Sequence, residues 1–286
     1  KYTDIGIKVS LDNLARYKKD ESEEIIKKFV NSKTNQETSD NMETLNLTQE
    51  WDKKFPQSDK VNHRKVTFKN RYGITLAADL YEPKNVEGKL AAIAVSGPFG
   101  AVKEQASGLY AQTMAERGFL TLAFDPSYTG ESGGEPRNVA SPDINTEDFS
   151  AAVDFLTALP NVDAERIGII GICGFGGMGL NAAAMDTRIK ATVASTMYDM
   201  SRVNANGYFD AEDSADDRNK KREMMNVIRT RDAQSGTITP GVHGLPDSIT
   251  GEEPQFVKDY FDYYKTNRGF HVRSINSNGA WSPTMT

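Results

Sequence analysis

Short apolar runs alternate with amphipathic stretches through the middle of the chain, from about residue 66 to residue 199. Two β-rich runs joined by a turn at Tyr72-Gly73 predict a pair of strands. The nearly continuous apolar runs that follow are typical of strands buried on both faces of a parallel sheet. In chain order, the predicted strands cover residues 66–68, 74–81, 90–96, 119–125, 167–172 and 189–195.

Helices are predicted between these strands. The segment at 103–117 is stopped by Gly118, and the segment at 146–159 places Phe149, Val153 and Leu156 on one stripe. A third, alanine-rich segment precedes the last strand. Strands that alternate with helices imply right-handed crossovers. We therefore expect an α/β fold class, with a mostly parallel central sheet and helices on both faces.

The alternation stops after Asp199. Residues 211–233 are charged with a helical pattern, and residues 254–264 predict a helix with aromatic side chains along one side. We expect three parts, namely an N-terminal helical arm and linker at 1–50, an α/β core at 51–199, and a helical cap with the start of a C-terminal part at 200–286. An ordinary helical subdomain with an aromatic core fits the last pattern equally well.

The composition argues against two classes of partner. A net charge of −6 supplies no broad cationic face, which argues against nucleic acid and acidic membranes as partners. No apolar run reaches the roughly 18 residues that a membrane span needs. The single cysteine excludes an internal disulfide, which suits a cytoplasmic or a periplasmic protein alike. No histidine and carboxylate cluster has metal-ligand spacing, so neither a metal nor a cofactor is expected.

The stretch at 166–185 organises the chain and reads R-I-G-I-I-G-I-C-G-F-G-G-M-G-L-N-A-A-A-M. Strand, tight turn and helix follow one another there, which puts Cys173 on a sharp corner where backbone N–H groups converge. Such a corner exposes a nucleophile, and Gly171 is the small residue that the motif wants two positions earlier. Phe175 is large where a second small residue is expected, and a frame shifted by two would put it at the nucleophile position. An inert, buried thiol at a strand end is the alternative.

The same glycines also match a dinucleotide-binding pattern. Residues 174–179 read G-F-G-G-M-G and follow a strand, and Asp199 lies about 20 residues further on, where a ribose-binding acid is expected. That fingerprint normally opens the first β-α-β unit of its domain, whereas several strands precede it here. A dinucleotide-binding oxidoreductase therefore ranks below nucleophilic catalysis.

Four strings taken together decide the ranking. They are S-G-P-F-G with V-K-E-Q at 96–105, F-D at 124–125, G-E-S-G-G-E-P-R at 130–137, and G-I-C at 171–173. From about Trp51 onward the chain resembles α/β-hydrolases of the dienelactone-hydrolase-like branch. The resemblance implies Cys173 as nucleophile, with the oxyanion held by the N–H of Gly174 and by an N–H near Phe99 or Gly100. It also implies that residues 125 and 130–134 shape the pocket floor, although plain turn architecture explains them as well.

The chain departs from that family after the predicted cap. The family order is nucleophile, then acid, then histidine, and neither a further apolar strand nor a histidine follows residue 276. His271 is the one histidine at a tolerable separation after Cys173, and a cap-anchoring role is favoured for it over that of base. We therefore expect a C-terminally incomplete hydrolase fold whose general base and acid lie outside this chain. A bare sheet edge would pair with another chain, either a homo-oligomer or a second chain that completes the sheet.

These observations predict a hydrolase that cleaves an ester, lactone or thioester bond of a small molecule through Cys173. Phe175, Tyr198 and His271 are the expected pocket-lining residues. The first alternative is a hydrolase-fold binding protein without catalysis, in which Phe175 fills the pocket. The dinucleotide-binding oxidoreductase is the second alternative.

Overall fold

The computed structural model describes residues 44–239, 245–275 and 280–281. Six strands form one sheet in the order β1-β2-β4-β3-β6-β7, in which β2 is antiparallel to both of its neighbours and the other pairs are parallel. The strands are β1 (Val61–Lys69), β2 (Thr75–Pro83), β3 (Leu90–Ser96), β4 (Leu120–Phe124), β6 (Val162–Ile172) and β7 (Ile189–Ser195). A separate parallel pair is formed by β5 (Val139–Ala140) and β8 (Ala280–Trp281). The predicted mostly parallel sheet is confirmed.

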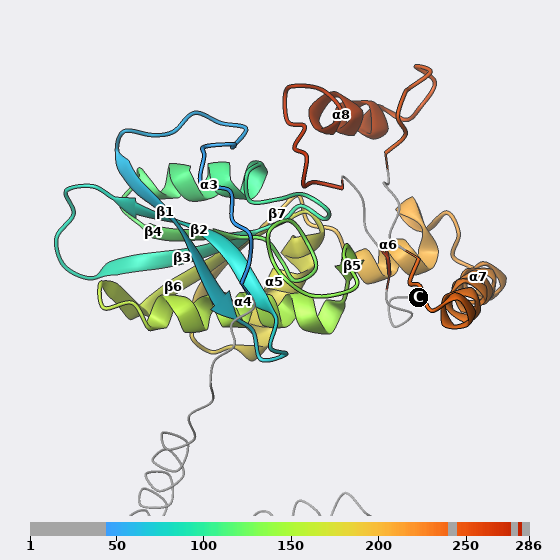
Figure 1. Cartoon of the computed structure of the whole chain (residues 1–286), viewed down its shortest axis with the longest axis horizontal. Coiled ribbons are helices and arrows are strands. Elements are labelled where there is room, and N and C mark those ends of the chain that lie inside the picture. The colour runs from blue at the N-terminus through green and yellow to red at the C-terminus, as the bar shows by residue number, and fades with distance from the viewer. Residues whose placement is uncertain (1–43, 240–244, 276–279, 282–286) are drawn as a thin grey trace, which may run out of the picture. The chain divides into compact units, whose positions relative to one another are not determined.

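Helices cover both faces of the sheet, as predicted (Figure 1). Helix α3 (Ala106–Ala115) packs on one face, and α4 (Pro142–Thr157) and α5 (Gly174–Met185) pack on the other. The helical elements after the last strand of the sheet are α6 (Met200–Asn206), η1 (Tyr208–Asp210), α7 (Ala215–Ser235) and α8 (Gln255–Tyr264). The predicted division into core and cap near residue 199 stays a prediction, and most of the predicted N-terminal arm lies outside the described residues.

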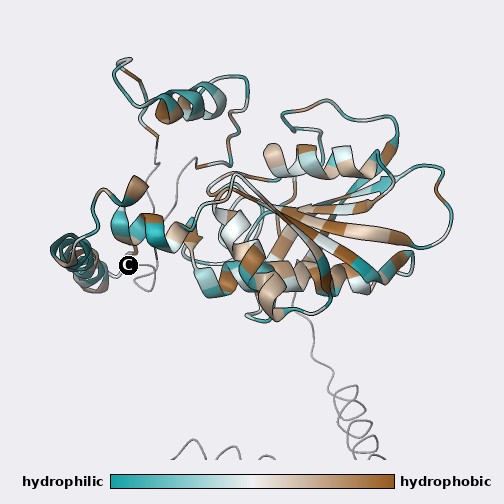
Figure 2. Cartoon of the chain, turned by 180° about the vertical axis from the view of Figure 1, so that it is seen from behind, coloured by the Kyte–Doolittle hydropathy of each residue, from teal (hydrophilic) through white to brown (hydrophobic). Residues whose placement is uncertain are grey.

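Hydrophobic burial on both faces explains why these runs form a sheet. All five residues of β4 are buried, and the central strands carry the long hydrophobic stretches in Figure 2. Phe149 of α4 and Leu122 of β4 belong to one apolar cluster, whereas Ala111 of α3 belongs to the cluster on the opposite face. At the edge of the described sheet, β7 is different, because its Val193 is 53% exposed.

The predicted helix at 103–117 begins later than its pattern indicates. Helix α3 starts at Ala106, because the three residues before it make buried contacts that a regular helix would break. The backbone N–H of Lys103 donates to Asp125 Oδ1 at 2.8 Å, and that of Val102 donates to the side-chain oxygen of Gln105 at 3.1 Å. These contacts belong to a buried ionic network.

The ammonium group of Lys103 lies at the centre of this network, and its side chain has no exposed surface. It lies 2.8 Å from Asp125 Oδ2, 2.7 Å from Glu131 Oε2 and 2.8 Å from Glu104 Oε1. Burial alone would lower the pKa of Lys103, but the carboxylates around it raise that pKa well above its usual range. Lys103 is therefore a cation at neutral pH and contacts three carboxylates.

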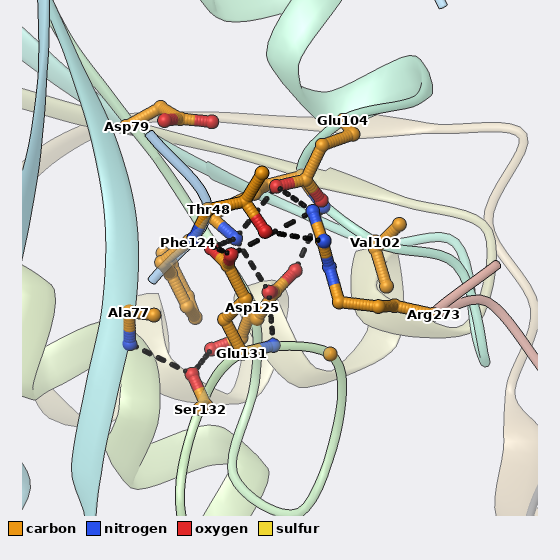
Figure 3. Close-up of polar contacts among 12 residues, drawn as sticks. Thr48, Ala77, Asp79, Val102, Glu104, Phe124, Asp125, Glu131, Ser132 and Arg273 are labelled. Atoms are coloured by element: carbon orange, nitrogen blue, oxygen red, sulfur yellow. Dashed lines mark hydrogen bonds and ion pairs between the residues drawn. The ribbon is translucent and has the colours of Figure 1, made fainter. Parts of the chain in front are cut away.

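Two further cations complete the network, and one of them, Arg273, is labelled in Figure 3. Lys65 of β1 contacts Glu131 and lies 3.5 Å from Glu104, and Arg273 lies 2.9 Å from Glu104 and 2.6 Å from Asp52. Burial raises the pKa of Glu131, but Lys103 and Lys65 lower it to about 2. The network thus joins β1, the loop after β3, the loop after β4 and the segment after α8.

The corner between β6 and α5 depends on two close backbone approaches. A Cβ atom at Gly171 would lie 2.2 Å from the carbonyl oxygen of Phe175, so a side chain there would block the first turn of α5. A Cβ atom at Gly97 would lie 2.3 Å from the carbonyl oxygen of Ile172 and 2.8 Å from Cβ of Phe175. Glycine at both positions lets the loop after β3 pass directly beside the corner.

Gly171→Ala should lower the free energy of unfolding by about 2–3 kcal/mol, because the backbone must shift to admit the methyl group. Gly179→Ala is the matched control on α5, where the nearest atom outside the helix backbone would be 3.5 Å from the new Cβ. In a helix interior, alanine in place of glycine should be neutral or stabilise by up to about 1 kcal/mol. Urea denaturation measures both variants, and equal effects would contradict the close approach at Gly171.

Glu131→Gln should destabilise the protein and make its acid unfolding less steep. The pKa of Glu131 is about 2 in the folded chain against an ordinary 4.5, so its contribution is complete above 4.5 and is lost as the pH falls toward 2. The shift corresponds to at most about 3 kcal/mol. Unfolding free energies measured across this pH range test it, with Glu165→Gln as the control, since the Glu165 side chain is 85% exposed. Identical acid slopes in wild type and Glu131→Gln would refute the assignment.

Candidate functional site

Cys173 occupies the corner between β6 and α5 in a backbone conformation that is rare for a residue with a side chain. Its φ is 57° and its ψ is −126°. Its N–H donates to the carbonyl of Ser195 at 2.9 Å, and its carbonyl accepts from the N–H groups of Gly176 at 2.9 Å and Tyr198 at 3.1 Å. Such a conformation costs on the order of 1–3 kcal/mol and is found most often where a side chain must be presented for function. These three hydrogen bonds hold Cys173 in it.

Two backbone amides point at the thiol. The N–H groups of Gly174 and Phe99 both make hydrogen bonds to the Cys173 side chain. Burial raises the pKa of the thiol, and these two amides act in the opposite direction because they favour the thiolate. The structure therefore brings Cys173, Gly174 and Phe99 together, and an N–H pair of this kind can bind a developing oxyanion.

Gly100 lies beside this pair but contributes a carbonyl to the surrounding contacts. Its oxygen accepts from the hydroxyl of Ser274 at 2.8 Å and from the N–H of Ile275 at 3.0 Å. Of the two loop amides that the sequence offered, the one at the thiol is thus that of Phe99. The two hydrogen bonds to the Gly100 carbonyl join Gly100 to the segment after α8.

Phe175 belongs to the core rather than to an open cleft. Its side chain is 2% exposed, and its ring centroid lies 5.3 Å from that of Phe99 and 6.3 Å from that of Phe149. A cavity of about 10 Å³ beside it, lined also by Phe99 and Gly100, has room for roughly one water molecule. Because Phe175 lies in the first turn of α5, Cys173 and not Phe175 is the corner residue, and the shifted motif frame is wrong.

Tyr198 belongs to an aromatic group near the thiol, which we call the tyrosine group and define as Tyr198, Tyr208, Tyr260 and Tyr264. The hydroxyls of Tyr198 and Tyr260 are 3.4 Å apart, and the rings of Tyr198 and Tyr208 meet edge to face with centroids 6.0 Å apart. Burial, together with the nearby Cys173, raises the pKa of Tyr208, Tyr260 and Tyr264. Helix α8 therefore presents phenol groups toward the corner.

The structure places His271 beside Asp52 and not beside Cys173. Its ring is 3% exposed, its Nε2 lies 3.5 Å from Asp52 Oδ2, and its Nδ1 accepts from the N–H of Arg273 at 3.3 Å. Burial lowers the pKa of His271, which keeps the ring neutral at physiological pH. The ring of His63 also has a carboxylate partner of its own, because its Nε2 lies 2.8 Å from Asp79 Oδ1. The third histidine, at position 243, lies outside the described residues.

Two further expectations concern Asp199 and bound metals. The carboxylate of Asp199 accepts the N–H of Arg202 and so caps α6. Within the described residues, no three histidine, cysteine or carboxylate side chains converge as metal ligands. No helix in that same part of the chain is both long and apolar enough to cross a bilayer.

Sequence reasoning missed two groups near the site. Lys103, Glu104 and Arg273 form the buried network behind the loop that carries Phe99, and the K-E string was noted only as part of a motif. Two consecutive charged residues beside a buried strand were a usable signal, whereas the involvement of Arg273 had none. The second set is Tyr208, Tyr260 and Tyr264. The aromatic spacing of 254–264 indicated Tyr260 and Tyr264, and no signal indicated Tyr208.

Comparison with known proteins supports the same fold. PA2218, an uncharacterised protein of Pseudomonas aeruginosa, is 65% identical over 241 residues, which are 84% of this chain and 64% of PA2218. Its crystal structure matches with a TM-score of 0.79 over 85% of this chain and 75% of that one. This chain thus spans less than two thirds of the length of PA2218.

Two fungal proteins are more distant. Thiohydrolase aneE of Aspergillus aculeatus is 31% identical over 137 residues, which are 48% of this chain and 42% of aneE. The α/β-hydrolase GrgF from Penicillium sp. sh18 is 22% identical and matches with a TM-score of 0.60 over 76% of this chain and 71% of that one, which is a likeness of fold alone.

The family assignment comes from the sequence itself. A family model described as X-Pro dipeptidyl-peptidase (S15 family) matches residues 72–243, which is more than half of the chain. The matched region contains β3, the β6–α5 corner and Cys173. This match shows that the chain belongs to the X-Pro dipeptidyl-peptidase (S15) family, and the sheet order together with the likeness to GrgF shows an α/β-hydrolase fold.

Proposed function

We propose that this chain carries the nucleophile and the oxyanion-binding groups of a hydrolase that cleaves carboxylic ester or thioester bonds. The observation that carries the proposal is Cys173 on its left-handed corner, with the N–H groups of Gly174 and Phe99 at its thiol. The thiohydrolase name of aneE supports thioesters as one substrate class. Lactones belong to the same chemistry, because their ring-opening attacks the same kind of carbonyl.

In the proposed reaction, the two amides stabilise the charge that forms when Cys173 attacks a carbonyl group. Sγ of Cys173 bonds to the carbonyl carbon, and the negative charge that develops on the carbonyl oxygen is taken up by the amides of Gly174 and Phe99. When the carbon–oxygen or carbon–sulfur bond breaks, the alcohol or thiol leaves with a proton. Water then attacks the acyl group on Cys173, which releases the carboxylic acid and restores the thiol.

Proton transfer needs a group beyond the described residues. Burial raises the pKa of the Cys173 thiol, so at neutral pH the thiol is mostly protonated and weakly nucleophilic. His271 lies against Asp52, and burial raises the pKa of Tyr208, Tyr260 and Tyr264, so none of these groups is both placed and ionised to act as a base on Cys173 at neutral pH. In this proposal the base and its orienting acid come from residues that the structure does not describe.

In this proposal, the tyrosine group contributes to the surface that binds the substrate. Tyr208 is 39% exposed, and its ring continues through Phe256, at 5.2 Å between centroids, to Tyr260 on α8. A surface of this kind binds apolar and aromatic groups and still offers hydroxyls for hydrogen bonds. In this proposal it contacts the acyl or the alcohol portion of the substrate.

The raised thiol pKa favours a second candidate, a hydrolase-fold binding protein without turnover. In that case Cys173 is a packing residue, and Phe175, which is buried in the core, contributes only to stability. The two candidates differ in what the thiol does with an activated acyl group.

Alkylation of Cys173 by iodoacetamide should accelerate steadily with pH and should not level off below pH 9.0. The thiolate is the reactive form, and partial burial raises the pKa of the thiol above its ordinary value of 9.0. The unfolded chain in guanidinium is the control, since its thiol has an ordinary pKa and its rate should level off at lower pH. A plateau at neutral pH in the folded chain would show a stabilised thiolate and contradict the raised pKa.

Reaction with p-nitrophenyl acetate tests the function itself. Attack by Cys173 should release nitrophenolate and leave one acetyl group on the chain, because the chain carries a single cysteine. Absorbance follows the released nitrophenolate, and intact mass with peptide mapping locates the acetyl group.

Cys173→Ala is the matched control and should show neither the nitrophenolate burst nor the added mass. If wild type and Cys173→Ala release nitrophenolate at the same rate and the thiol stays free, the nucleophile is rejected. That outcome would favour the binding protein.

A further inference from the structure

The segment after helix α8 makes hydrogen bonds and an ion pair with the loop that carries Phe99. We call residues 269–275 the clasp segment and residues 97–105 the oxyanion loop. The side-chain amide of Gln105 donates to the carbonyl of Gly269 at 2.6 Å. At the other end, the carbonyl of Gly100 accepts from both Ser274 and Ile275. The two segments, about 170 residues apart in sequence, are thus joined at both ends of their contact.

An ionic contact joins them in the middle. Arg273 of the clasp segment lies 2.9 Å from Glu104 of the oxyanion loop, whose carboxylate has no exposed surface. Glu104 in turn lies 2.8 Å from the ammonium of Lys103. With Lys65 at 3.5 Å as well, this buried carboxylate has three cationic partners and a fixed place, because moving away from them would leave charge unpaired.

These contacts act on the turn that contains Phe99. The N–H of Ala101 donates to the carbonyl of Pro98 at 3.1 Å and closes the turn around Phe99. The carbonyl of Gly100, one residue after Phe99, accepts hydrogen bonds from Ser274 and Ile275 of the clasp segment. A turn with one end on β3 and its Gly100 carbonyl fixed leaves the N–H of Phe99 little freedom to rotate away from the thiol.

We infer that the clasp segment sets the position of the Phe99 N–H toward Cys173, with Ser274 and Arg273 as positioning residues. The inference rests on the proposed function only in taking that N–H as an oxyanion donor. It adds a link that the proposed chemistry does not require. The same segment packs on α8, since a Cβ atom at Gly269 would lie 2.5 Å from the ring of Tyr263. The helix that bears Tyr260 and the loop that holds the oxyanion therefore share one connection.

The test measures the pKa of the Cys173 thiol in the full chain through the pH dependence of its alkylation by iodoacetamide. Ser274→Ala removes one hydroxyl donor to Gly100 and changes no charge. Arg273→Gln removes the contact with Glu104. The control is Arg268→Gln, four residues after helix α8, because the side chain of Arg268 is 67% exposed and forms its ion pair with the exposed Asp262.

Both clasp variants should raise the thiol pKa, whereas the control should leave it unchanged. A hydrogen bond to a charged group that is weakened or lost makes alkylation at neutral pH up to about tenfold slower. The limiting rate at high pH should stay the same, since access to the thiol is not altered. General loosening of the structure would instead expose the thiol, lower its pKa and raise the limiting rate.

An unchanged thiol pKa in folded Ser274→Ala overturns the inference, and so does an equal rise in Arg268→Gln. If Arg273→Gln fails to fold, as judged by its circular dichroism, Ser274→Ala decides alone. A rise in Ser274→Ala cannot come from a lost positive charge. Alkylation needs no acyl transfer, so failure of the p-nitrophenyl acetate reaction would reject the proposed function and leave this result standing.

Discussion

The buried ammonium group of Lys103 is the constraint on which the arrangement of the loops depends. It has no contact with solvent, so its charge is tolerable only where carboxylates surround it. Asp125 comes from the end of β4, Glu131 from the loop that follows, and Glu104 from the start of the segment before α3. Replacing such a network by apolar side chains can stabilise a protein, so its value here lies in fixing a single arrangement of these loops rather than in stability alone.

The strain at Cys173 and the ionic network are two parts of one arrangement. The corner presents the thiol, but the thiol alone has a raised pKa and little reactivity. The loop after β3 supplies a backbone N–H at the right place only because glycine at position 97 lets it approach the corner and because Lys103 and Asp125 hold its far end. The position of the Phe99 amide thus depends both on the backbone geometry of the corner and on the buried charges at the far end of its loop.

Hydrophobic periodicity predicted the sheet well because it reports which faces are buried. The strand at 90–96 was predicted with the bounds that β3 has, and the strand at 189–195 with those of β7. Polar partners leave no such local trace. Nothing near Glu104 in sequence indicates that its partner is Arg273, and the pattern at 103–105 looked helical because long-range ion pairs do not affect periodicity. The candidate corner was visible for the opposite reason, since a strand, glycines and a helix are all local. His271 illustrates the limit, because its separation from Cys173 suited a triad while its contact with Asp52 could not be read.

The solitary sulfur at the corner also makes the molecule convenient to observe. With one cysteine in 286 residues, a fluorophore or spin label can be attached at that position without removing any other thiol by mutation. Because Cys173 contributes to the raised pKa values of Tyr260 and Tyr264, a label on the sulfur would lie near phenol groups of α8. The sequence therefore already contains a single attachment point from which the surroundings of the corner can be observed.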